Sequence, residues 1–187
     1  MAGVTIGLIV IIGLAVIAVL YFITVYNRLV GMRQGVRNAW AQIDVQLKRR
    51  ADLIPNVVET VMGYAAHERG VFEEVTKARS AWASAKTVQE HAQADNMITA
   101  ALKSLFAVAE AYPDLKANQN FLALQQELSN TEGQIATARS VYNIAVQSYN
   151  TQIQVFPANM VASMTGFRGE PYFQAEEAAR EAVEVKF

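Results

Sequence analysis

The sequence predicts an all-α protein, with an N-terminal transmembrane helix that continues into an antiparallel four-helix bundle and ends in a short irregular tail. Three observations support this prediction. The first 27 residues contain no charged side chain. Apolar residues of the following body recur every three or four positions, which is the period of a helix with one buried face. The body shows no alternation of period two, the pattern typical of strands. We divide the chain into residues 4–26 (transmembrane helix), 27–157 (bundle domain) and 158–187 (tail).

The anchor is predicted by its length and its apolar composition. Residues 4–25 read VTIGLIVIIGLAVIAVLYFITV. A helix of this length spans about 33 Å, and the hydrocarbon core of a bilayer is about 30 Å thick. A cleaved secretory signal is the alternative. However, no Lys or Arg precedes the run, the run is longer than a signal core, and no A-x-A site follows it. We therefore expect a retained anchor that crosses the membrane once.

The charges beside the anchor predict its orientation. Residues 28–50 contain six basic residues and one acidic residue, a net charge of +5. Because basic residues next to a spanning helix tend to stay in the cytoplasm, we expect an outside N-terminus and a cytoplasmic body. Aromatic and basic side chains at this end of the helix are expected to lie at the membrane interface. These are Tyr21, Phe22, Tyr26, Arg28, Arg33 and Arg37.

The rest of the chain differs in charge from this basic stretch. Residues 51–187 contain ten basic and sixteen acidic residues, a net charge of −6. We expect no nucleic-acid partner, because contacts between basic side chains and phosphates dominate that affinity. The chain contains no Cys, which excludes disulfides and thiol chemistry and agrees with a reducing cytoplasm.

Two helical stripes are predicted in the first half of the body. Pro55 is expected to kink the first helix, because proline lacks a backbone donor. The second helix is expected over residues 67–85. The first stripe comprises Val36, Trp40, Ile43, Leu47, Ala51, Ile54, Val58, Val61 and Ala65, and the second comprises Val71, Val75, Ala78, Trp82 and Ala85.

Two further helices are predicted before the tail. Thr87 and Glu90 have the spacing of a capping box at the start of a helix over residues 87–112, and Pro113 either closes that helix or opens the next. Its predicted inner face is Met97, Ala101, Leu105, Val108 and Tyr112. The fourth helix has a 3.5-residue period from Phe121 to Phe156 and is expected to end at Pro157.

Gly166, Gly169 and Pro171 interrupt regular structure in the tail. Beyond them, residues 174–184 are expected to form a short helix. Residues 183–187 alternate apolar and polar side chains, as a short strand or a docked extended end does.

The order of several motifs resembles the LemA family. The motifs are Y-N-x-L at 26–29, A-x-x-Q-I-D-V-Q-L-K-R-R-x-D-L-I-P-N at 39–56, E-x-x-I-x-x-A-R-x-x-Y-N at 132–143, Y-N at 149–150 and F-P at 156–157. The resemblance covers nearly the whole chain, from the anchor to Pro157. It implies a single-pass protein of the bacterial inner membrane with a cytoplasmic helical bundle and with no established catalytic reaction.

Polar residues within these motifs lie on or beside the apolar stripes. We interpret them as a structural polar network that fixes the register of the helices. The alternative interpretation is a recognition surface. The residues are Asp44, Arg50, Asp52, Asn56, Glu132, Arg139, Asn143 and Asn150.

The sequence offers little that points to catalysis. His67 and His91 are the only histidines, and neither belongs to an E-x-x-H or H-E-x-x-H motif. No phosphate-binding loop is present. We therefore expect no catalytic site, no metal and no cofactor, and we do not expect an enzyme. Tyr142 and Tyr149 recur at heptad spacing, which favours core packing over a ladder that stacks a ligand.

These observations favour a membrane-anchored, non-enzymatic scaffold or adaptor that self-associates or presents its body to an unknown protein partner. Gly3 and Gly7 form a small-x-x-x-small pair, which predicts a helix contact within the membrane. Thr131 and Gln152 are polar positions within the apolar heptad seam of the fourth helix. If this seam packs against another chain, they would set the register of the two helices. The alternative is that helices of the same chain fill the seam. The alternative function is a lipid- or small-ligand-binding module that senses or remodels the membrane.

Overall fold

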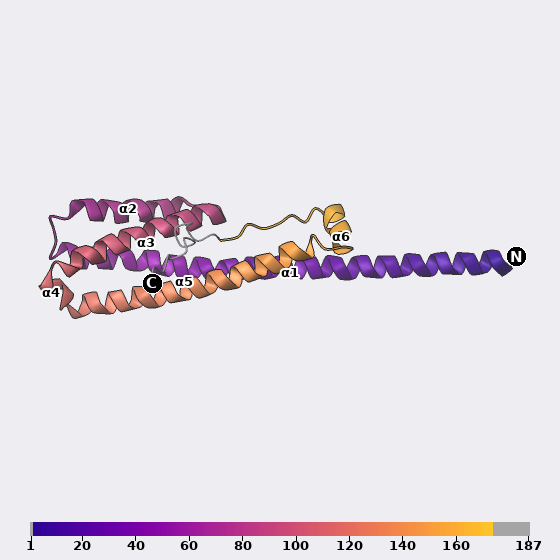
Figure 1. Ribbon diagram of the computed structural model, residues 1–187, viewed down its shortest axis with the longest axis horizontal. Helices are drawn as coiled ribbons and strands as arrows, with labels where there is room; N and C mark the ends of the chain where they lie inside the picture. The colour runs from indigo at the N-terminus through magenta and orange to yellow at the C-terminus, as the bar shows by residue number, and fades with distance from the viewer. Residues whose placement is uncertain (1, 174–187) are drawn as a thin grey trace, which may run out of the picture. The chain divides into compact units, whose positions relative to one another are not determined.

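The computed structural model describes residues 2–173, and these residues are helical apart from turns and extended connections. The six helices over this range are α1 (Ala2–Met62), α2 (Arg69–Ser84), α3 (Val88–Glu110), α4 (Pro113–Lys116), α5 (Gln119–Gln152) and α6 (Ala158–Thr165) (Figure 1). The prediction of an all-α fold with a long apolar N-terminal helix is confirmed. The helix expected over 174–184 and the extended end expected over 183–187 lie outside the described residues.

The described chain forms two compact units. The first, which we call the anchor unit, comprises the residues up to Ala39 together with Asn143–Glu170. The second, the body unit, comprises Trp40–Tyr142 together with the described residues from Pro171 onward. The domain boundaries expected after residues 26 and 157 stay predictions.

The apolar segment of α1 in the anchor unit is exposed along its length. It is long and apolar enough to cross a membrane, and none of its most apolar window is buried within the protein. A core helix of a soluble protein buries such side chains, whereas a spanning helix presents them to lipid on every side. Burial begins with Val25 and Leu29, where the apolar run gives way to the first charged residues. The exposed apolar segment therefore has the character of a single-pass membrane anchor and not of a core helix.

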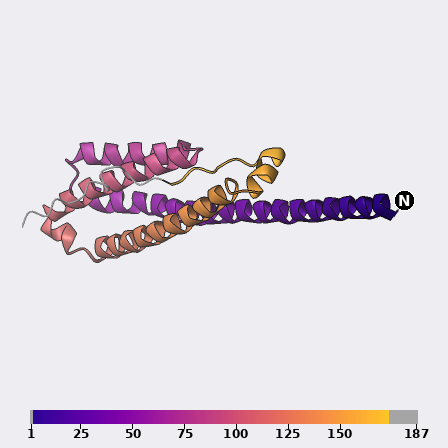
Figure 2. The ribbon, with the colours of Figure 1, turned by 45° about the vertical axis from the view of Figure 1, so that its right-hand side comes forward.

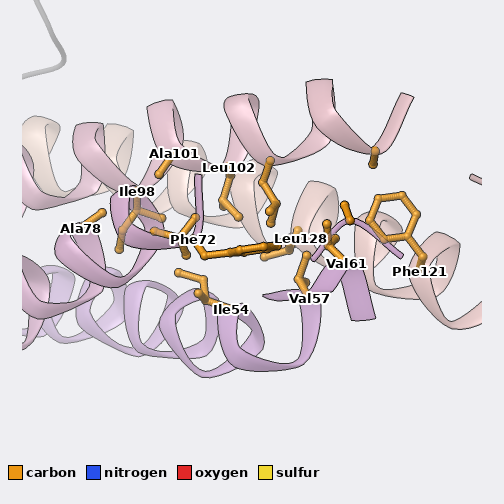
Figure 3. Packing of buried hydrophobic residues seen from close by; sticks show 14 of the residues in the cluster. Ile54, Val57, Val61, Phe72, Ala78, Ile98, Ala101, Leu102, Phe121 and Leu128 are labelled. Carbon is orange, nitrogen blue, oxygen red and sulfur yellow. The ribbon is translucent and has the colours of Figure 1, made fainter. Parts of the chain in front are cut away.

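The body unit contains one hydrophobic core to which α1 to α5 all contribute. Figure 3 shows Ile54, Val57 and Val61 of α1 facing Ile98 and Leu102 of α3 in this core. In both ribbon views α2 and α3 lie side by side and run in opposite directions (Figures 1 and 2). Further core residues are Phe72, Val75 and Ala78 of α2, Ala101, Leu105 and Ala109 of α3, Leu115 of α4, and Phe121 and Leu128 of α5.

The helices of the body unit begin and end close to the predicted positions. α1 continues through Pro55 to Met62. The capping box of α3 is confirmed, because Thr87 Oγ1 accepts from the Glu90 N–H at 3.2 Å and a Glu90 carboxylate oxygen accepts from the Thr87 N–H at 3.0 Å. Pro113 opens the short helix α4. Proline suits this position because the N–H of the first helical residue has no hydrogen-bond acceptor within the helix.

Two predictions about the end of the chain need correction. α5 ends at Gln152, not at Pro157, and the side chain of Phe156 is 79% exposed and lies outside the seam. The residue before a proline disfavours helical backbone, so the helix ends in turns before that point. The tail is not irregular throughout, because Pro157 precedes the eight-residue helix α6. Gly166, with a φ of 74°, ends α6 in a backbone conformation that favours glycine.

The core of the body unit predicts a strong dependence on Leu105, which is fully buried in α3. We expect Leu105→Ala to lower the free energy of unfolding by about 2–5 kcal/mol, because it removes buried apolar surface and leaves a cavity. The matched control is Leu122→Ala, since Leu122 is exposed on α5. Surface changes of this kind usually stay within about 0.5 kcal/mol. Urea unfolding of the full-length protein in mild detergent, followed by far-UV circular dichroism, measures both. Equal losses in the two variants would contradict this core assignment.

Candidate functional site

The most highly charged part of the interior centres on Asp95 of α3, which is 0% exposed. Arg50 of α1, 1% exposed, donates through Nη2 to Asp95 Oδ1 and to the Asp95 main-chain oxygen, the latter at 3.2 Å. Its Nη1 donates to Glu132 Oε2 at 2.6 Å and to Thr99 Oγ1 at 3.2 Å. Arg139 of α5 forms an ion pair with the Asp95 carboxylate. We call Arg50, Asp95, Thr99, Glu132 and Arg139 the ionic cluster.

Helical periodicity explains why these side chains meet. Asp95 and Thr99 are one turn apart on α3, and Glu132 and Arg139 are two turns apart on one face of α5. Arg50 lies three positions after buried Leu47 on α1, so it shares the buried face of that helix. Three helices thus each contribute charge to one place.

The ionic cluster balances two guanidinium groups with two carboxylates. Burial lowers the pKa of Arg50 from its ordinary value, while the Coulombic attraction and hydrogen bond of Glu132 oppose that shift. Such a buried group is costly to transfer from water, and its partners offset the cost only while all of them stay in place. The arrangement therefore acts as a geometric constraint on α1, α3 and α5.

The structure brings together three of the polar residues that the sequence singles out: Arg50, Glu132 and Arg139. Asp44, Asp52 and Asn56 are exposed on α1 and lie outside the ionic cluster. Asn143 and Asn150 are half-buried in the anchor unit.

The central carboxylate, Asp95, was missed by sequence reasoning. The predicted face of α3 ran through Met97, whereas the buried face runs through Asp95, Ile98, Leu102 and Leu105. An acidic residue three positions before a buried isoleucine, in register with the apolar stripe, is the signal that identifies it.

Aromatic side chains lie beside the ionic cluster in the body unit. The Trp40 ring contacts Tyr142 at 5.7 Å and His91 at 5.4 Å between centroids. The Arg139 guanidinium lies 5.0 Å from the ring centroid of Phe173. Tyr142 donates its hydroxyl to the Pro171 carbonyl at 2.8 Å. These contacts hold the described residues after Pro171 against the helices, and the packing interpretation of Tyr142 is confirmed.

An open groove of about 630 Å³ runs between α1 and α5 on the body unit. Its lining includes small side chains, and a Cβ added at Gly133 would meet no atom within 4 Å. Val45 and Val141 expose apolar surface beside it. The other residues of the groove are Ala41, Gln42, Gln46, Asn130, Gln134, Thr137 and Ala138. Small side chains allow the backbone of another helix to approach closely.

Metal ligands do not gather in the described part of the chain. Within residues 2–173 no group of three or more His, Asp or Glu side chains is placed to hold a metal ion. His67 is exposed, and His91 packs among Trp40 and Trp82.

The sequence is similar to a known protein family and to several known proteins. The model of the LemA family matches residues 39–187. The chain belongs to the LemA family. Protein LemA of Metamycoplasma hominis is 30% identical over 176 residues, which cover 90% of this chain and 78% of that relative. Magnetosome protein MamQ 2 of Paramagnetospirillum magneticum is 27% identical over 195 residues, covering 88% of this chain and 72% of that relative.

Two of the motifs that resemble the LemA family contribute side chains to the ionic cluster of this LemA-family protein. The motif at 39–56 supplies Arg50, and the motif at 132–143 supplies Glu132 and Arg139. Residues far apart in the sequence therefore serve one cluster, whose central Asp95 lies outside both motifs.

We expect the loss of the Asp95 charge to reduce the stability of the protein strongly. We expect Asp95→Ala to lower the free energy of unfolding by about 3–5 kcal/mol, because two guanidinium groups lose their shared buried partner. Asp44→Ala is the control, since Asp44 is exposed on α1 and a change there should cost less than about 0.5 kcal/mol. Urea unfolding of both full-length variants in mild detergent checks this. An Asp95→Ala protein as stable as the control would show that the cluster is not a constraint.

Proposed function

We propose that this LemA-family protein is a non-enzymatic scaffold or adaptor, anchored in the bacterial inner membrane by α1. The observation that carries the scaffold role is the open groove of the body unit, where small side chains from α1 and α5 leave room for a helix. The relatives named as magnetosome proteins are named for a cellular structure and not for a reaction, which supports a scaffold over an enzyme.

The proposal includes self-association. Gly3 and Gly7 have nothing within 4 Å of an added Cβ, so this face of the anchor accommodates close approach of a second helix. Symmetric homo-oligomers are common among proteins, and confinement of two copies to one membrane favours their encounter. A cytoplasmic protein partner is the alternative occupant of the groove.

The proposed topology places the N-terminus outside and the body in the cytoplasm. Arg28 and Arg37 are exposed directly after the apolar segment of α1, as expected for residues that flank the cytoplasmic end of a spanning helix. Tyr21 and Tyr26 are exposed at the same end, where aromatic side chains favour the interface.

A second candidate function is a lipid- or small-ligand-binding module that senses or remodels the membrane. The exposed Arg28 and Arg37 favour it, because juxtamembrane basic residues bind anionic lipid headgroups with about 1 kcal/mol each. Arg33 differs from these two, since its guanidinium lies 4.9 Å from the ring centroid of Phe167 in the anchor unit.

The topology predicts opposite results for two reporters fused after Phe187 in a bacterial host. A green fluorescent protein should fluoresce, because it folds in the cytoplasm, and an alkaline phosphatase should stay inactive, because it requires an oxidising compartment. Replacing Arg28, Arg33 and Arg37 together by glutamine should weaken this orientation, whereas a control with Lys77, Arg79 and Lys86 replaced should keep it. Phosphatase activity on the unmodified protein would contradict the proposed topology.

The groove predicts that filling it reduces self-association. We expect Gly133→Leu to weaken dimer formation about tenfold, equivalent to about 1.4 kcal/mol, because the added side chain occupies the space for a second helix. The backbone should tolerate this change, since Gly is a poorer helix former than Leu. Ala136→Leu is the matched control, because Ala136 is exposed on α5 outside the groove. Native mass measurement in mild detergent over a concentration series checks both variants. A purely monomeric unmodified protein would remove self-association from the proposal.

A further inference from the structure

A second apolar surface lies in the anchor unit, apart from the membrane-spanning part of α1. Residues 140–167 contain no charged side chain over 28 positions, a length approached in this chain only by the first 27 residues. Phe156 is 79% exposed and Met164 is 76% exposed, and Val155 and Met160 are also exposed. Large exposed apolar side chains that gather in one place mark contact with a partner or a membrane.

This surface is continuous with the anchor. An apolar hollow of about 310 Å³ is lined by Ala18, Tyr21 and Phe22 of α1 on one side. On the other side its lining comes from Pro157 and from α6, namely Met160, Val161 and Met164. Met160 and Met164 are one turn apart on α6, whereas Ala158, Val161 and Ala162 are buried. α6 therefore has a face against the protein and an exposed apolar edge beside the lipid-facing surface of α1.

The chain after α6 is also held against the anchor unit. Past Gly166, the Phe167 ring packs edge-on against Tyr26, with centroids 5.8 Å apart. The Arg33 guanidinium lies over the same ring. α6 is thus bounded on one side by contacts near Phe22 and on the other by contacts near Tyr26 and Arg33.

The position of these contacts along α1 indicates a depth in the bilayer. Ala18 and Phe22 precede Val25, the end of the apolar run, by seven and three residues. At ~1.5 Å per residue they lie about 5–10 Å inside that end. Interfacial amphipathic helices bury their apolar face by about 5–10 Å at the boundary between headgroups and acyl chains. The first charged residue, Arg28, follows on the side of the headgroups.

We propose that α6 and the preceding residues 155–157 form a second membrane-contact element. It lies in the interface of the leaflet that Tyr21 and Phe22 reach. Phe156, Met160 and Met164 insert among the outer acyl segments, and the polar Asn159 and Ser163 stay toward the headgroups. The occupant of this surface is lipid, because the surface continues one that already faces lipid and carries no charge of its own. The inference rests on the proposed membrane anchoring by α1.

The absence of Cys makes a direct test practicable, because one introduced cysteine can be labelled uniquely. Met164→Cys and Phe156→Cys place an NBD fluorophore on the proposed element, and both native side chains are exposed. Leu14→Cys places it at the middle of the anchor, and Ser84→Cys, exposed at the end of α2, reports the body unit. Each labelled full-length protein is reconstituted in phosphatidylcholine–phosphatidylglycerol vesicles that contain phospholipid with a doxyl group at carbon 5 or carbon 12.

We expect the labels at positions 164 and 156 to be quenched at least twofold more by the carbon-5 doxyl lipid than by the carbon-12 lipid. The label at position 14 should show the reverse order, and the label at position 84 should not be quenched.

Three outcomes overturn the inference, and they differ in what else they remove. If position 14 is quenched but positions 156 and 164 behave like position 84, α6 is not in the membrane although the anchor is. If position 14 also fails to be quenched, the proposed anchoring is lost as well. If positions 156 and 164 are shielded from lipid and the unlabelled Met164→Cys protein forms disulfide-linked dimers on oxidation, a second copy covers α6.

Discussion

A buried carboxylate shared by two guanidinium groups constrains the body of this protein. Asp95 receives Arg50 from α1 and Arg139 from α5, so three helices must hold one relative register for the charges to be compensated. A slip of α5 by one turn would move its side chains by about 5.4 Å, more than the length of an ion pair. Apolar side chains tolerate such slips far better, because any apolar neighbour of similar volume serves. Burial of apolar residues supplies most of the stability, and the ionic cluster selects one arrangement among those that burial allows.

The same helix that carries this constraint also presents the groove. α5 turns Ile135 and Tyr142 toward the core and leaves Gly133 and Thr137 on its outer side. Burial of small side chains alone contributes little hydrophobic free energy to binding. Such side chains do, however, permit the backbone of another helix to approach closely. A docking surface of this kind needs a rigid support, because a mobile helix loses conformational entropy when a partner binds. The ionic cluster ties Glu132 and Arg139 of α5 to α1 and α3, and it would give the proposed docking surface this support.

Sequence reasoning predicted the features that local periodicity and length determine. The apolar run of α1 exceeds what a soluble helix tolerates, and the spacing of Thr87 and Glu90 sets where α3 begins. Asp95 was missed because its partners lie 45 and 44 residues away in the sequence. No local pattern reveals which distant cation will reach a carboxylate. The end of α5 was misplaced for a related reason, since helical spacing in the seam continues to Phe156 although the backbone does not. The groove depends on how α1 and α5 pack, which periodicity alone does not specify.

The tyrosine–asparagine pair at 149–150, one of the sequence motifs, holds the chain that follows α6 within the anchor unit. Asn150 donates its amide to the Glu170 carbonyl at 2.9 Å and accepts from the Glu170 N–H at 2.9 Å, while Tyr149 donates to the Arg168 carbonyl at 2.9 Å. Burial raises the pKa of Tyr149, with Glu170 acting in the same direction and Arg33 opposing. A Cβ at Gly169 would lie 3.3 Å from the Asn150 side-chain oxygen, which explains a glycine at this close approach. These bonds mimic the two-sided pairing of a backbone strand and fix the chain directly after α6. Tyr149 and Asn150 therefore hold residues 168–170 in place through polar contacts. By doing so they keep the exposed methionines of α6 beside the apolar segment of α1, where, in the proposed arrangement, lipid shields them from water.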